Sequence, residues 1–219
     1  NNAVGNPLFF ELPPARTATF KYSWLDQDKV LDLNPFWPFT VSRMVFFPDF
    51  SNKTNRAEQY ARSATGVEIK NDTYFLPVFL KYLKLASDEM EKGLVFYRKA
   101  ALAAPEIKKE QAIKEVIVAE QMQRMMQSDS AILEFEHLRL QLAGEERLER
   151  KNEILNNMEK IVEEEIARTE LSLLAATRDS RLGFQFEQDY VYTPYSLNEK
   201  LLLLKETLFK QLPAAKKNC

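Results

Sequence analysis

The residues best suited to chemistry lie in one short stretch, RDSRLGFQFEQDYVYTP, which covers positions 178–194. It places Asp179 two residues before Arg181 and carries Tyr190 and Tyr192 near its end. A guanidinium offers forked hydrogen-bond donors and tyrosine rings offer stacking faces, so these four side chains could together contact a sugar or a neighbouring domain. The same residues also fit a structural role, in which Asp179 accepts backbone N–H groups in a turn or pairs with Arg181.

Two groups of acidic residues elsewhere favour solvation or packing over catalysis. Glu163, Glu164 and Glu165 are consecutive in a helical pattern and point in three directions, so we expect a solvated face and no shared metal ion. Glu120 and Asp129 interrupt the apolar stripe of their helix, but no Glu-x-x-His pair accompanies them, which argues against a di-iron bundle.

The histidine and the clustered methionines suggest packing. His137 is the single histidine of the chain and lies within the helical stretch LEFEHLRL, so we interpret it as a helix-surface or packing residue. Met122, Met125 and Met126 are interpreted as core filling and not as a copper site.

Composition excludes several classes of function. The formal net charge of −2 gives no overall field for nucleic acid or an anionic membrane. The only cysteine is Cys219, so neither a disulfide framework nor a Cys/His metal site is expected, and no cofactor or metal is predicted. No apolar run approaches the ~20 residues of a membrane span. The first residues do not form a signal peptide, which suggests a cytosolic chain or one from which a signal peptide was removed.

The chain divides into two parts of different composition. The first 50 residues hold both tryptophans, eight of the 15 phenylalanines and six of the ten prolines. We predict an irregular aromatic and proline-rich segment over 1–55, with short strands where apolar and polar residues alternate. It either ends a preceding domain or packs on the helices. A helical domain follows over 56–212, and residues 213–219 are expected to form a frayed tail.

The helical part reads as an antiparallel bundle of long helices, so the predicted fold class is mainly α. Apolar residues at spacings of three and four predict helices from about 74 to 103, from 105 to 144 and from 148 to 178. Short turns at Pro105 and Gly144 make neighbouring helices antiparallel. A last helix over 196–212 is predicted to begin with Ser196 as N-cap and Glu199 at the capping-box position.

The segment ARTELSLLAATRDSRLGFQFEQDYVYTPYSLNEKL resembles the closing segment of large bacterial glycoside-hydrolase-like, carbohydrate-active proteins. In that group a barrel precedes a helical C-terminal domain, whose long helix ends in an Asp-Ser-Arg-Leu-Gly-aromatic run, followed by Tyr, Thr-Pro and a final helix. The matching residues here are 179–184, Tyr190, Tyr192, Thr193 and Pro194. The similarity covers about the last 60 residues and, by architecture, the middle of the chain.

This resemblance implies a non-catalytic helical domain that supports a catalytic barrel of the same polypeptide and can contact an oligosaccharide. Asp179, Arg181, Tyr190 and Tyr192 would be its ligand-binding residues. A glycosidase needs two carboxylates about 5 to 10 Å apart, and the resemblance implies that these lie upstream, in a periplasmic or extracellular protein. The alternative is a self-contained helical scaffold that binds proteins and has no carbohydrate role.

Overall fold

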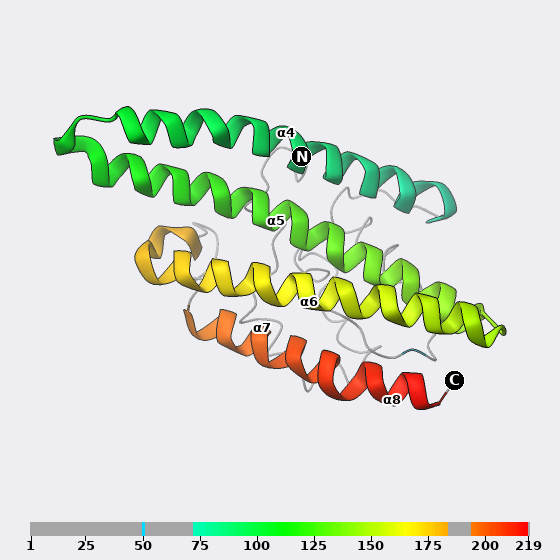
Figure 1. Cartoon of the computed structure of the whole chain (residues 1–219). Helices are drawn as coiled ribbons and strands as arrows, with labels where there is room; N and C mark the ends of the chain where they lie inside the picture. The colour runs from blue at the N-terminus through cyan, green and yellow to red at the C-terminus, as the bar shows by residue number, and fades with distance from the viewer. Residues whose placement is uncertain (1–49, 51–71, 184–193, 219) are drawn as a thin grey trace, which may run out of the picture.

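The computed structural model describes Phe50, residues 72–183 and residues 194–218 (Figure 1). Nearly all of these residues are helical and none of them lies in a strand, which confirms a mainly α fold for the described part. The short strands expected within 1–55 lie outside the described residues.

Three long helices and a shorter C-terminal pair make up this part. They are α4 (Asp72–Ala103), α5 (Glu106–Gly144), α6 (Leu148–Arg178), α7 (Pro194–Glu206) and α8 (Leu212–Lys217). A 3₁₀ turn, η4 (Ser180–Gly183), follows α6, and a π-helical turn, η5 (Thr207–Gln211), joins α7 to α8. Pro105 stands immediately before α5 with φ of −56°, as expected for a residue that opens a helix without its own N–H donor.

The helices lie side by side in chain order. α4 packs on α5, α5 on α6, and α6 on α7 and α8 (Figure 1). Each of the first four runs opposite to the one before it (Figure 1). α6 is therefore held between α5 and the C-terminal helices, and α4 lies at an edge of the described layer.

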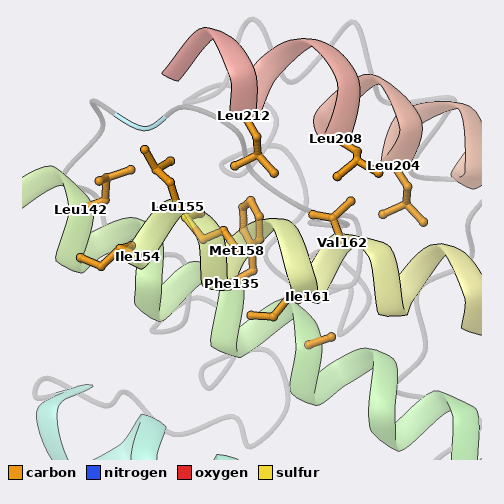
Figure 2. Packing of buried hydrophobic residues seen from close by; sticks show 11 residues of the cluster. Phe135, Leu142, Ile154, Leu155, Met158, Ile161, Val162, Leu204, Leu208 and Leu212 are labelled. Carbon is orange, nitrogen blue, oxygen red and sulfur yellow. The ribbon is translucent and has the colours of Figure 1, made fainter. Parts of the chain in front are cut away.

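The hydrophobic core lies where α5, α6 and α7–α8 meet. Figure 2 shows leucines of the C-terminal helices directed at α6, with the ring of Phe135 from α5 between them. Leu155, Met158 and Val162 recur on one side of α6 and are completely buried. Burial of such side chains contributes roughly 1.5 to 3 kcal/mol each. The cluster comprises Ala131, Phe135, Leu142, Ile154, Leu155, Met158, Ile161, Val162, Leu204, Leu208 and Leu212.

The C-terminal residues differ from the expected frayed tail. The helix continues beyond Leu212, through Pro213, to Lys217. A proline inside a regular helix would lose a hydrogen bond and clash with the preceding turn, but η5 widens that turn and Pro213 falls in the first turn of α8. Lys216 Nζ lies 2.6 Å from Glu159 Oε2 on α6, and this ion pair holds the end of the chain against the layer.

The start of α7 also differs from the sequence prediction. The helix begins at Pro194, so Ser196 lies in its first turn and not at its N-cap. Proline is favoured at the first helical position because its φ is already helical and its missing N–H would have had no partner there.

Candidate functional site

The turn after α6 is built around Asp179. This residue caps the helix, its backbone N–H donates to the carbonyl of Ala175, and its side chain is buried. Its carboxylate accepts hydrogen bonds from the Arg181 backbone N–H at 3.0 Å and from Arg181 Nε and Nη2 at 3.0 and 2.7 Å. Both roles considered from the sequence, acceptor in the turn and partner of Arg181, are therefore present together.

These hydrogen bonds fix the charges of the pair. Those from Arg181 hold the pKa of Asp179 below its usual range, against the opposing effect of burial. The same contacts raise the pKa of Arg181, with a further contribution from Glu115. Asp179 is therefore a carboxylate and Arg181 a cation across the physiological pH range.

Arg181 also connects the turn to a helix far away in the sequence. Its Nη1 donates to Oε1 of Glu115 on α5 at 3.2 Å, and the same carboxylate oxygen accepts from Gln111 Nε2 at 2.6 Å. Leu182, next in η4, is buried. The side chain of Arg181 nevertheless stays 49% exposed, so part of its surface can meet another molecule.

Of the four predicted ligand-binding residues, the structure describes two. Asp179 and Arg181 lie in direct contact. Tyr190 and Tyr192 lie outside the described residues, as do Phe184 and Phe186.

A second polar centre lies between α5, α6 and α7. Glu165 of α6 is completely buried and accepts hydrogen bonds from Lys200 Nζ of α7 at 2.6 Å and from Ser128 Oγ of α5 at 2.7 Å. Arg168, one turn further along α6, also contacts its carboxylate. The expectation that Glu163, Glu164 and Glu165 form a solvated face is therefore wrong for Glu165, because three partners replace the water that this carboxylate would lose.

The two carboxyl groups of this centre have opposite pKa shifts. Burial acts to raise the pKa of Glu165, but Lys200, Arg168 and the hydrogen bond from Ser128 outweigh it, and the pKa is lowered. Burial raises the pKa of Asp129 well above its usual range; the charge of Lys200 opposes this rise and that of Glu165 adds to it. A glutamate with a lowered pKa and an aspartic acid with a raised pKa thus share one buried region.

Such opposed pKa values are also found in acid–base catalysts. Here both carboxyl groups are buried, with Asp129 only 5% exposed and Glu165 fully enclosed, so a substrate has no access to them. The centre is suited to fixing the positions of three helices, because each partner of Glu165 is satisfied in only one register.

The remaining polar candidates have ordinary surroundings. Glu120 accepts from Arg98 of α4 at 3.0 Å, which links the first two long helices. His137 Nε2 lies 2.7 Å from Gln141 Nε2, one helical turn away. Met125 is 2% exposed, in agreement with core filling. Within the described ranges, no group of three His, Cys, Asp or Glu residues could hold a metal ion.

Sequence reasoning missed Lys200 and Arg168. A signal for Lys200 was available, since it lies three residues after Leu197 and four before Leu204, within the apolar stripe of its helix. A lysine at such a position has to be paired if it is buried.

Searches with protein-family models, among curated proteins and among solved structures found no match to this chain. In addition, no helix in the described part of the chain is long and apolar enough to cross a membrane.

Proposed function

We propose that this chain is a non-catalytic supporting domain, an antiparallel helical bundle that braces a catalytic barrel in a periplasmic or extracellular glycoside-hydrolase-like protein. The observation that carries the supporting role is the contact of Arg181 with both Asp179 and Glu115. Asp179, Arg181 and Leu182 of the Asp-Ser-Arg-Leu-Gly run are engaged by the chain itself, which is what a bracing role requires.

The carbohydrate part of the proposal rests on the resemblance of this same run and of the Tyr and Thr-Pro that follow it. The half-exposed guanidinium of Arg181 is compatible with it, since hydroxyl groups of a sugar can accept from N–H groups that Asp179 and Glu115 leave open. Asp179 would then position the guanidinium, and Tyr190 and Tyr192 would supply stacking faces.

Thermal unfolding in the presence of oligosaccharides tests this role. A panel of soluble plant and bacterial oligosaccharides should raise the melting temperature of the chain, and Arg181→Ala or Tyr192→Ala should reduce the increase. Arg150→Ala is the matched control, because Arg150 also makes an exposed ion pair, with Glu153 on α6, away from the turn. No shift with any sugar, or equal shifts in all variants, would contradict a saccharide contact.

A second function, a protein-binding scaffold, is favoured by the outer face of α4. Val78, Tyr82, Leu85 and Phe96 recur at helical spacing on one side of this edge helix and are 45% to 69% exposed. Leu94, Ser87 and Ala101, which are buried, lie on the opposite side. Exposed apolar stripes of this kind are typical of surfaces that bind another protein.

Self-association distinguishes the two functions. A scaffold that uses this stripe predicts a molecular mass in solution that rises with concentration, and a return to monomer in Phe96→Lys with unchanged helicity. A supporting domain of a larger polypeptide predicts a saccharide response and no specific oligomer. If the isolated chain hydrolysed aryl glycosides with a bell-shaped pH profile, the non-catalytic role would be wrong.

A further inference from the structure

Helix α5 buries two separate stripes of side chains. The first stripe, Ala131, Phe135, Leu138 and Leu142, belongs to the core formed with α6 and the C-terminal helices. The second stripe, defined here as Met125, Asp129, Ile132, Glu136 and Arg139, also recurs in steps of four and three and is buried throughout. Adjacent residues of a helix point about 100° apart around its axis. Ala131 belongs to the first stripe and its neighbour Ile132 to the second, so the two stripes lie about 100° apart around α5.

The second stripe does not face α4. Contacts between the two helices are made by Glu120, which binds Arg98, and by Gln123, which donates to the carbonyl of Ser87. Glu120 precedes Asp129 by nine residues, and Gln123 precedes Ile132 by nine. Nine residues correspond to two and a half turns, so the α4 contacts lie about 180° around α5 from the second stripe.

Asp129 lies at the edge of the second stripe, near the charges of Lys200 and Glu165. The apolar members of this stripe are separate from the core around α6. Met125 and Ile132 are 2% and 6% exposed, yet neither belongs to the cluster that joins α5, α6 and α7–α8. Arg139 is completely enclosed and its guanidinium binds Glu136 through two hydrogen bonds of 2.7 and 2.8 Å. This side of α5 carries two buried apolar residues and an ion pair that is shielded from water. Such a side chain set must be covered by another part of the protein, because an ion pair is removed from water only where other groups pack over it.

We propose that this layer is the aromatic and proline-rich segment 1–49 of the same chain, which docks on the second stripe of α5. The segment ends at Phe50, and Phe50 packs against the core cluster to which α5 contributes Phe135 and Leu142. The polypeptide is therefore anchored at the core that α5 helps to form, at the point where the segment ends. Its 49 residues are more than long enough to follow a stripe of four helical turns, which is only about 20 Å long.

The chemistry of the segment fits the surface. It holds both tryptophans, seven phenylalanines and six prolines, whose side chains together supply a large apolar area. Aromatic rings cover Met125 and Ile132 by ordinary packing, and a thioether makes favourable contacts with them. Rings also stack on guanidinium groups, which suits a buried arginine such as Arg139.

Tryptophan fluorescence tests this docking in the intact chain, because Trp24 and Trp37 are the only tryptophans and both belong to the segment. The native emission should be shifted to the blue of that in guanidinium chloride and should be protected from acrylamide. Native emission that matches the denatured chain, with full acrylamide access, would overturn the proposal.

A pair of matched variants locates the docking surface. Ile132→Asp places a charge in the second stripe, whereas Ile113→Asp makes the same change at an exposed position of the same helix. We expect a red shift and greater acrylamide quenching in Ile132→Asp only, with the helical circular dichroism signal retained. Retained helicity with unaltered tryptophan emission would contradict docking at this stripe.

A proximity measurement covers the case in which Ile132→Asp fails to fold. With Cys219→Ser as background, a nitroxide label on Met122→Cys, which is half-buried and lies three residues before the stripe, should quench tryptophan emission strongly. The same label on Leu171→Cys, at an exposed position of α6, should quench it weakly. Equal quenching at the two positions, or none at Met122→Cys, would show that the segment lies elsewhere.

Discussion

Lys200 of α7 donates to Glu165 of α6 across 2.6 Å, and both side chains are buried. Among the described residues this is the buried ion pair between these two helices; the other pair that joins them, Lys205 with Glu170, is about half exposed. The buried pair therefore gives the C-terminal helices a fixed register against α6.

Removal of the lysine should be costly. In Lys200→Met the Glu165 carboxylate keeps Ser128 and Arg168 but loses the more deeply buried of its two cationic partners, and we expect a loss of about 3 kcal/mol in the free energy of unfolding. Urea denaturation followed by circular dichroism measures it. Lys205→Met is the control, because Lys205 lies 3.9 Å from Glu170 and both are about half exposed, so its loss should be within about 0.5 kcal/mol. Equal losses of stability in Lys200→Met and Lys205→Met would show that the buried contact of Lys200 with Glu165 contributes no more than a surface ion pair.

The buried Asp129 should make stability depend on pH in the unusual direction. Its folded-state pKa is raised, so between the ordinary carboxyl pKa and the raised value the folded chain binds more protons than the unfolded chain. This group therefore makes the protein less stable as pH rises through that range. Asp129→Asn should remove this contribution and be at least as stable as the wild type at pH 7. Denaturation curves from pH 4 to 8 measure how the free energy of unfolding changes with pH in both proteins. If Asp129→Asn showed the same pH dependence as the wild type, Asp129 would not be the cause of that dependence.

Glu165 should act in the opposite sense. Its pKa in the folded state is lowered, so its ionised form stabilises the fold. This stabilisation is fully present above the ordinary glutamate pKa and disappears as pH falls through the pKa of the folded state. We expect Glu165→Gln to be less stable than the wild type at pH 7, with a difference that shrinks toward acidic pH. The same denaturation series, extended to pH 3, follows the difference; a constant gap would mean that lost packing, and not ionisation, is responsible.

The turn after α6 should depend on Asp179 more than on the surface ion pair that Arg181 makes with α5. Asp179→Asn weakens a charge-assisted set of hydrogen bonds at a buried site, for which we expect a loss of about 1 to 2 kcal/mol. Glu115→Gln removes only a half-exposed partner and should have a small effect. Thermal and urea unfolding of both variants compare them. A larger effect at Glu115 would place the essential contact on α5 instead of in the turn.

Much of the helical part could be predicted from the sequence. Pro105 and Gly144 mark the turns between helices, and the apolar periodicity set the ends of α5 and α6 within one residue. The start of α7 was misplaced because Ser196 and Glu199 fit a capping box while Pro194, two residues earlier, fits the first helical position equally well. The π turn that carries the chain past Pro213 has no sequence signature of its own, and neither the core position of Leu212 nor the pairing of Lys216 with Glu159 can be read from one helix alone.

The candidate site was predictable only where its contacts are local. Asp179 and Arg181 are two residues apart, and their pairing follows from turn chemistry. Glu165 was misjudged because its burial is decided by Lys200 and Ser128, which lie 35 and 37 residues away in the chain. The periodicity of one helix shows that a polar residue interrupts a stripe, but it does not show which residue of another helix will face it.

The central claim, that this chain supports a larger carbohydrate-active protein, is tested most directly by the mass of the native polypeptide in its source cells, detected with an antibody to this chain. The account predicts a product several times larger than 25.5 kDa, in which this helical domain accompanies a barrel with paired catalytic carboxylates. A native product of 25.5 kDa would contradict it and favour a free-standing helical scaffold.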